Sequence, residues 1–305
     1  MLKLGYIILA HQKPHQLLQL LRSLSSDSTY LFLHIDKRLD PSVFLSANGI
    51  ADIKNLVLLP RFKSYWGSIG LAKASLHGIR EALNYECDYI TLLSGSDYPI
   101  KSNKQILQFL SESNGKSYVD YYRMPAPFWI PGKEINRIKK YYYHFKNRIF
   151  EHPPSPDGKG LFRKLLGGVL RLFLKNEREF PTGIIPFGGE HWFCLHKPAA
   201  RQVLSFYEKN PEVMKFLTYS LSPEEIYVQT ALFNSGDKEL ETSICNQAIT
   251  LINWKNKNHP SPAFFDSSDF DRLISSDKLF ARKFDFDACP DLLTRINHQL
   301  LDNQE

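Results

Sequence analysis

The sequence contains few cysteines, and they are widely separated. They form no CxxC pair and no Cys/His spacing typical of a zinc site. Nothing in this pattern requires an oxidising compartment, so reduced thiols in a cytoplasm are the simplest interpretation. The four residues are Cys87, Cys194, Cys245 and Cys289.

Long apolar runs are also absent. No stretch approaches the roughly 18 apolar residues that cross a membrane. Residues 1–11 place Lys3 before a short apolar stretch, as a signal peptide would. The stretch is too short, however, and no small-residue cleavage site follows, so the sequence predicts a first strand there.

Several common catalytic signatures are missing. The chain has no Walker phosphate loop, no GxSxG, no HExxH and no convincing GxGxxG, so the usual hydrolase, phosphotransferase and dehydrogenase classes are not indicated. The net charge of +6 favours an anionic partner such as a nucleotide, a phosphate or an acidic membrane surface. Because Lys and Arg are interspersed with Asp and Glu, a nucleic-acid-binding protein is not suggested.

What is present is an apolar content of 43%, with 13% aromatics, over 305 residues, enough for a substantial globular core. Apolar runs typical of strands alternate with stretches of helical spacing over the first 110 or so residues. This alternation predicts a doubly wound α/β sheet flanked by helices, with a ligand crevice at the carboxyl ends of its strands. The expected strands are residues 4–10, 30–36, 56–60 and 89–93, and the helices 14–24, 67–85 and 105–111.

Four polar residues fall at those strand ends: His11, Asp36, Arg61 and Asp97. The last follows the apolar run 89–93 directly, within the sequence SGSDYP. We expect residues 94–99 to form a turn, with Asp97 as its lone carboxylate.

The second half of the chain is expected to resume regular structure after an aromatic and basic middle region, residues 118–180. Residues 161–178 mix Leu and Phe with basic residues. They fit either a surface helix that covers the core or a basic amphipathic helix on an anionic membrane. Strands are expected at 191–196 and 245–254, helices at 198–210 and 222–235, and an amphipathic stretch at 269–285.

Six segments occur in the order found in the core-2/I-branching N-acetylglucosaminyltransferases, a family that includes peptide O-xylosyltransferases. They are HIDKR (34–38), YWGSIGLAKA (65–74), LLSGSDYPIKSN (92–103), GGEHWF (188–193), SPEEIYVQT (222–230) and LFARKFD (279–285). The chain resembles this family over nearly its whole length. The resemblance implies an inverting, UDP-sugar-dependent glycosyltransferase of the GT-A fold that lacks the metal-binding DxD motif.

The resemblance implies how the donor would be held without a metal. Arg282 and Lys283 match the positions that bind the diphosphate, where a guanidinium and an ammonium can stabilise the leaving UDP. Their alternative is the solvated side of an amphipathic segment. Asp97 resembles the residue that hydrogen-bonds the donor sugar, and its alternative is an Asx-type turn before Pro99.

Glu225 matches the family's catalytic base, which removes a proton from the acceptor hydroxyl. The alternative is structural: Ser222, Pro223 and Glu225 also read as a capping box at a helix start, and a capping glutamate could not face an acceptor. Glu224 is the fallback base.

The remaining site residues also follow from the resemblance. His11 and Asp36 are expected at the uridine, and Trp66 in the donor pocket, although a buried Trp is more often part of a core. Three consecutive residues, Glu190, His191 and Trp192, are expected at the acceptor. Further contacts to an anionic ligand are Arg137, Lys139 and Lys140.

These assignments lead to a single GT-A domain over residues 1–305. Residues 1–115 are expected to bind the nucleotide sugar, 116–180 to be a variable insertion, and 181–305 to bind the acceptor and carry the base. Lacking the membrane anchor and disulfides of eukaryotic members, the chain is interpreted as a bacterial, cytoplasmic enzyme, peripheral at the membrane through 161–178.

The predicted substrates are a UDP-sugar, most readily UDP-N-acetylglucosamine, and a glycan or lipid-linked glycan, with neither a cofactor nor a divalent metal. Xylosyl or other sugar transfer, or a non-catalytic carbohydrate- or nucleotide-binding protein, remains the alternative.

Overall fold

The structure is a computed structural model of the chain. It describes residues 2–45, 49–126, 134–145, 148–154, 177–254 and 261–302. Among these residues, no helix is long and apolar enough to cross a membrane.

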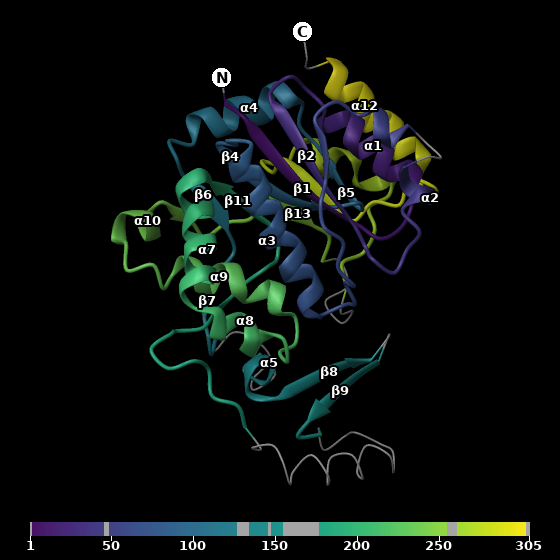
Figure 1. Cartoon of the computed structure of the whole chain (residues 1–305). Helices are drawn as coiled ribbons and strands as arrows, with labels where there is room; N and C mark the ends of the chain where they lie inside the picture. The colour runs from purple at the N-terminus through teal and green to yellow at the C-terminus, as the bar shows by residue number, and fades with distance from the viewer. Residues whose placement is uncertain are drawn as a thin grey trace.

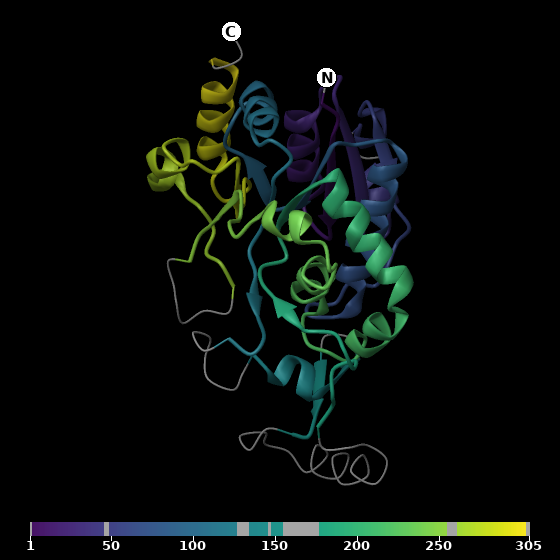
Figure 2. The same ribbon diagram turned by 90° about the vertical axis from the view of Figure 1, so that its left-hand side faces the viewer.

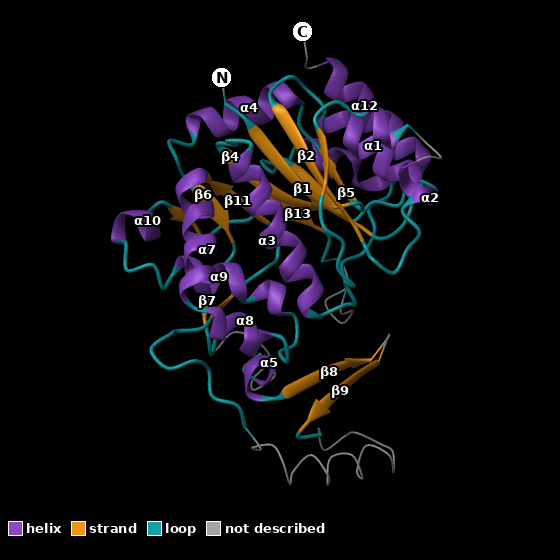
Figure 3. Ribbon diagram, viewed as in Figure 1, coloured by secondary structure: helices purple, strands orange, loops and turns teal. Residues whose placement is uncertain are grey.

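A seven-stranded mixed sheet forms the centre of the molecule (Figure 3). Its strand order is β12-β6-β11-β4-β1-β2-β3. Strands β1 to β4 pair in parallel, and β11 runs antiparallel to both β4 and β6. The strands are β1 (Leu4–Ala10), β2 (Thr29–Ile35), β3 (Leu56–Leu58), β4 (Tyr89–Ser94), β6 (Ser117–Val119), β11 (Phe193–His196) and β12 (Ile244–Cys245).

Helices cover both faces of this sheet (Figures 1 and 2). Side chains alternate in direction along a strand, so β1 contributes to two cores. Tyr6 and Ile8 pack in one cluster with the leucines of α1 (Pro14–Leu24), and α12 (Pro290–Asp302) joins them. Ile7 and Leu9 pack in the other with α3 (Ile69–Asn84) and α7 (Lys197–Lys209). The predicted α/β architecture, a doubly wound mixed sheet flanked by helices, is confirmed.

A second, three-stranded sheet joins distant parts of the chain. Its order is β13-β14-β5, formed by Thr250–Ile252, Phe280–Arg282 and Asp97–Pro99. The prediction that residues 94–99 form only a turn is therefore wrong, because the last three of them pair antiparallel with β14 and place Asp97 opposite Arg282.

The expected single strand at 245–254 is also wrong. It is two strands in different sheets, β12 and β13. Asn246 separates them, because its side chain bonds to both the backbone N–H and the carbonyl of Tyr121 and so turns the chain. The expected helix at 222–235 is instead a 3-10 turn, η2 (Pro223–Glu225), followed by α9 (Tyr227–Leu232).

The middle region begins inside the central sheet, since Ser117–Val119 is β6. Further along lie α5 (Asn136–Lys139) and a hairpin of β8 (Tyr141–Phe145) and β9 (Arg148–His152). This hairpin lies at the end of the molecule opposite α12 (Figures 1 and 2). Most of the predicted amphipathic segment, residues 161–176, lies outside the described residues.

Shorter elements complete the described chain. They are α2 (Ser42–Leu45), η1 (Ile50–Asp52), α4 (Asn103–Glu112), β7 (Tyr122–Arg123), β10 (Phe187–Gly188), α8 (Pro211–Leu217), α10 (Lys238–Thr242), η3 (Ser267–Asp269) and α11 (Phe270–Ile274).

Candidate active site

A cavity of about 340 Å³ opens at the carboxyl ends of β1 and β4. Leu9, near the end of β1, and Ser94, the last residue of β4, both line it, as the doubly wound topology predicts. Of the predicted donor, acceptor and catalytic residues, the cavity brings together all but Asp36 and Asp97, and the predicted ligand contacts Arg137, Lys139 and Lys140 do not line it either. Those that line it are His11, Trp66, Glu190, His191, Trp192, Glu225, Arg282 and Lys283.

Asp97 lies behind the cavity wall rather than in it. Its side chain is fully buried, and its carboxylate accepts hydrogen bonds from the backbone N–H of Ser94 (2.9 Å) and the Ser94 hydroxyl (2.7 Å). The third donor is Nε of Arg282, at 3.0 Å. A buried carboxylate with a paired cation and two further donors is fully engaged within the protein.

Arg282 does reach the cavity, held between two partners. Asp97 binds its Nε, while the guanidinium carbon lies 3.7 Å from the ring centroid of Trp192. Stacking on an indole suits the planar guanidinium and fixes its orientation. With its side chain only 11% exposed, Arg282 is not on the solvated side of an amphipathic segment.

Lys283 lines the same cavity and donates a hydrogen bond to the Ser261 hydroxyl at 2.7 Å. Burial lowers the pKa of Lys283, and the neighbouring positive charge of Arg282 lowers it further. Two adjacent cations that disfavour each other form a region ready to bind an anion.

Glu225 faces the cavity from η2, and Arg137 of α5 binds its carboxylate at 2.5 Å. The capping-box alternative is wrong. Ser222 is in the left-handed conformation, with φ 50°, and its side chain makes no capping hydrogen bond. Glu225 is therefore free of a capping role.

Two backbone hydrogen bonds hold the η2 turn against other parts of the site. Gly189 N–H donates to the carbonyl of Glu225 at 3.0 Å. Ser222 N–H donates to the carbonyl of Gly67 at 3.0 Å. The turn that carries Glu225 is thereby tied both to the GGEHWF segment and to the loop of Trp66.

Two more glutamates line the cavity. Burial raises the pKa of Glu190 to about 7, and the nearby Asp120 carboxylate raises it as well. Burial, followed by the charge of Glu225, raises the pKa of Glu224 to about 8. The site therefore contains carboxyls that hold a proton near neutral pH.

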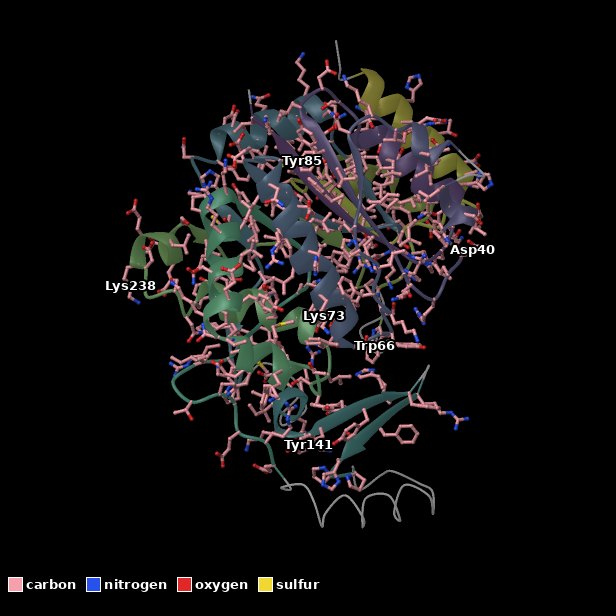
Figure 4. The ribbon with its side chains drawn as sticks, in the orientation of Figure 1. Asp40, Trp66, Lys73, Tyr85, Tyr141 and Lys238 are labelled. Carbon is pink, nitrogen blue, oxygen red and sulfur yellow. The ribbon has the colours of Figure 1, made fainter. Side chains whose placement is uncertain are left out.

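Trp66 is 67% exposed, so it is not part of a core. Figure 4 shows it at the end of the main body that faces the β8–β9 hairpin, where Tyr141 lies. His191, by contrast, is buried and bonds to the Ser75 hydroxyl at 2.9 Å. Burial lowers the pKa of His191 to about 3, so its ring is neutral.

Asp36 is buried and bound by Arg38, which reaches its carboxylate through Nε (3.0 Å) and through a second guanidinium nitrogen (2.6 Å). Arg61, the other charged residue at a strand end, donates only to backbone carbonyls, such as that of Ile35. Neither Asp36 nor Arg61 is among the residues that line the cavity.

The basic side chains of α5 and of Lys140, which follows it, form ion pairs with acidic residues. Arg137 binds Glu225, while Lys139 and Lys140 pair with Glu177 and Glu151 respectively. The expectation that Arg137 binds an anionic ligand did not foresee its pairing with the catalytic candidate.

Two cavity aromatics were not predicted. Trp254 and Phe264, 45% and 50% exposed, flank the cavity next to Ser261. Trp254 also donates a side-chain hydrogen bond to Glu190. Their sequence signal was slight, since neither Trp254 nor the pair Phe264-Phe265 belongs to a periodic pattern. Among the residues described, no group of three His, Cys, Asp or Glu side chains could hold a metal ion.

Comparison with known proteins bears on this site. The model of the Core-2/I-Branching enzyme family matches residues 4–273. The chain belongs to this family. It is 26% identical to xylosyltransferase 2 of Homo sapiens over 98% of its length, and 24% identical to xylosyltransferase 1 of Canis lupus familiaris over 99%. It spans about a third of the length of these relatives, 34% and 31%.

A search of solved structures finds Staphylococcus aureus TarS residues 1–349. It has a TM-score of 0.35 and 11% identity, and the match covers 76% of this chain and 56% of that one.

Proposed function

We propose that the protein is a UDP-sugar-dependent glycosyltransferase that transfers a sugar to a glycan hydroxyl, with inversion at the anomeric carbon. The observation that carries this proposal is the shared cavity, in which the carboxylate of Glu225 lies with the cations Arg282 and Lys283. Membership of the Core-2/I-Branching enzyme family supports the same reaction class. We propose N-acetylglucosamine as the donor sugar, with xylose as the alternative that the relatives' names favour.

The mechanism assigns one step to each end of the cavity. Glu225 takes the proton of the acceptor hydroxyl while that oxygen bonds to the anomeric carbon from the face opposite UDP. The bond between the anomeric carbon and the diphosphate oxygen breaks, and its electron pair leaves with UDP. Arg282 and Lys283 stabilise the negative charge that develops on the diphosphate.

We propose that these two cations perform the work that a divalent metal performs in other nucleotide-sugar enzymes. The donor set supports this view. Asp97, the single acid of the predicted donor turn, is bound by Arg282 and Ser94 and is not arranged as a metal ligand. Arg282 instead presents its guanidinium from a fixed position.

The acceptor that we propose is a glycan, or a lipid-linked glycan, at the cytoplasmic face of a bacterial membrane during surface polysaccharide synthesis. The net charge of +6 and the basic composition of residues 161–178 support it. Co-sedimentation with phosphatidylglycerol vesicles, but not with phosphatidylcholine vesicles, is expected. Equal recovery in the supernatant with both would remove the membrane part of the proposal.

Hydrolysis of UDP-N-acetylglucosamine, UDP-xylose and UDP-glucose tests the reaction, with and without EDTA. We expect UDP release with at least one donor and no loss in EDTA. Glu225→Gln should lower kcat by about 100-fold or more, since a general base contributes on the order of 10² to 10⁴. Glu212→Gln, a change to an exposed glutamate of α8, is the control.

Three results would count against parts of this scheme. Activity abolished by EDTA would contradict the metal-free step. Full activity of Glu225→Gln would remove the base. Tight donor binding without any turnover would favour the non-catalytic alternative.

A further inference from the structure

The charged groups of the cavity are sorted into two ends. At one end, burial lowers the pKa of His11 most; the charge of Asp36 raises this pKa, and the charges of Arg38, Lys283 and Arg282 lower it further. At the other end, the charges that act on Glu224 are Glu225 on the same turn and Arg137 of α5. Glu190 lies between the ends, because both Arg282 and Glu225 affect its pKa. The cavity therefore has a cationic and an acidic end.

Glu224 is the unexplained group at the acidic end. It lines the cavity, is only 6% exposed, and no described residue makes a hydrogen bond to its buried Oε2. Native structures rarely leave such an atom unpaired, because the missing bond destabilises the fold. Because Glu224 also lines the cavity, the missing partner of its carboxyl is explained if that partner arrives with the substrate.

The protonation state of Glu224 defines that partner. With its pKa raised to about 8 by burial and by Glu225, the carboxyl carries a proton at pH 7. A protonated carboxyl has one O–H donor and retains acceptor capacity, and sugar hydroxyls offer the same pair of functions. Helices α3 and α9 also pack against this turn, and within the described chain neither adds a charge to those that act on Glu224.

The two ends also orient the donor. The diphosphate belongs at Arg282 and Lys283, so the sugar attached to it extends toward Glu225, which must lie across the anomeric carbon from UDP. That direction leads to Glu224. We propose, on the basis of the function proposed above, that Glu224 binds the donor sugar as an uncharged carboxyl, with Oε2 hydrogen-bonded to a sugar hydroxyl.

Calorimetric measurement of UDP and UDP-sugar binding tests whether Glu224 contacts the sugar or the UDP part of the donor. The probes are UDP and whichever of UDP-N-acetylglucosamine, UDP-xylose and UDP-glucose binds the wild type most tightly. Glu224→Leu, which keeps the approximate volume but no polar atom, should weaken the UDP-sugar about 10-fold, equivalent to the loss of one hydrogen bond of about 1.4 kcal/mol. Its affinity for UDP should stay within twofold of the wild type, which also shows that the variant is folded.

Glu224→Gln is the matched variant, because an amide resembles a protonated carboxyl. It should bind the UDP-sugar within about threefold of the wild type at pH 7. From pH 7 to 9 the wild type should lose its preference for the UDP-sugar over UDP as Glu224 ionises, whereas the Gln variant should keep it. The ratio of the two affinities cancels the titration of groups that contact UDP alone.

Several outcomes would overturn the inference. One is equal binding of UDP and every UDP-sugar by the wild type, and another is a Glu224→Leu variant that still prefers the UDP-sugar over UDP. A third is a Glu224→Gln variant that binds the UDP-sugar as weakly as Glu224→Leu does, which would mean that the ionised carboxylate binds the sugar. Absence of UDP binding by the wild type would refute the proposed function itself, and is thus a distinct result.

Discussion

The ion pair between Asp97 and Arg282 makes a quantitative prediction. Asp97→Asn removes the charge opposite a guanidinium whose side chain is 11% exposed, while keeping the size of the residue. At 3.0 Å and an effective dielectric constant of about 20, the two charges attract by about 5 kcal/mol. Desolvation offsets part of this attraction, and breaking a buried pair by removing one partner costs about 3–5 kcal/mol. Because the amide oxygen of the new side chain could still accept a hydrogen bond, we expect Asp97→Asn to lower the free energy of unfolding by about 3 kcal/mol.

Urea and thermal unfolding measure this change. In a chain of this size each kcal/mol shifts Tm by roughly 2 °C, so Asp97→Asn should lower Tm by about 6 °C. A double-mutant cycle with Arg282→Gln isolates the pair, and we expect a coupling energy of about 2 kcal/mol. A coupling below about 0.5 kcal/mol, with Tm unchanged, would refute the reasoning.

The same variant also distinguishes two roles for Asp97. If the carboxylate positions Arg282 and does not touch the sugar, Asp97→Asn should weaken UDP and UDP-sugar by the same factor, about 10-fold. If the carboxylate binds sugar hydroxyls, as the family resemblance implied, Asp97→Asn should weaken the binding of the UDP-sugar but not that of UDP. Glu212→Gln serves again as the control. A selective loss for the UDP-sugar would contradict the positioning role.

Three further predictions concern Glu225, Glu224 and His191. Arg137→Gln removes the cation that holds Glu225 and should lower kcat about 10-fold or more with little change in UDP affinity; steady-state kinetics and calorimetry check this, and an unchanged kcat would contradict it. The pKa of Glu224 is raised from 4.5 in the unfolded chain to about 8, so the folded state binds the extra proton and stability should fall as pH rises from about 5 to 8. Urea unfolding at several pH values should show that Glu224→Gln reduces this pH-dependent loss of stability, by a few kcal/mol at most. A Gln variant with the same pH dependence of stability as the wild type would contradict the prediction. His191 has the opposite sign: its pKa falls from 6.5 to about 3, so stability should be lost as pH drops below about 6.5, and His191→Asn should flatten this acid limb of the urea midpoint.

The local pattern of the sequence was sufficient for the parallel half of the central sheet. Strands β1, β2 and β4 are short apolar runs, and α1 and α3 show helical spacing, so period alone identified them. The mixed sheet β13-β14-β5 was not predictable in this way. Each of its strands has three residues, and the β5–β14 pairing is a contact between segments 185 residues apart, as Asp97 and Arg282 show. Strands of three residues are too short to show the alternation of apolar and polar residues by which a strand is predicted.

The candidate site divides along the same line. Motif resemblance identified Glu225, Arg282 and Lys283, which do share a cavity. Residue spacing could not reveal that the carboxylate of Asp97 is paired with Arg282, because this ion pair depends on the register between the distant strands β5 and β14. Nor could it reveal Trp254, which joins the cavity because β13 pairs with β14.

The position of Arg137 gives the middle region a part in the site. Arg178, itself buried, donates hydrogen bonds to the carbonyls of Lys140 and Tyr219, and so clamps the end of α5 to the segment that leads into η2. The N–H of Leu221 also donates to the carbonyl of Arg137. These bonds fix α5 relative to the turn that carries Glu225, so the 2.5 Å contact between Arg137 and Glu225 is set by backbone rather than by two long side chains alone. A region that the sequence marked as a variable insertion therefore positions the carboxylate of Glu225, through α5 and through Arg178, which holds α5 in place.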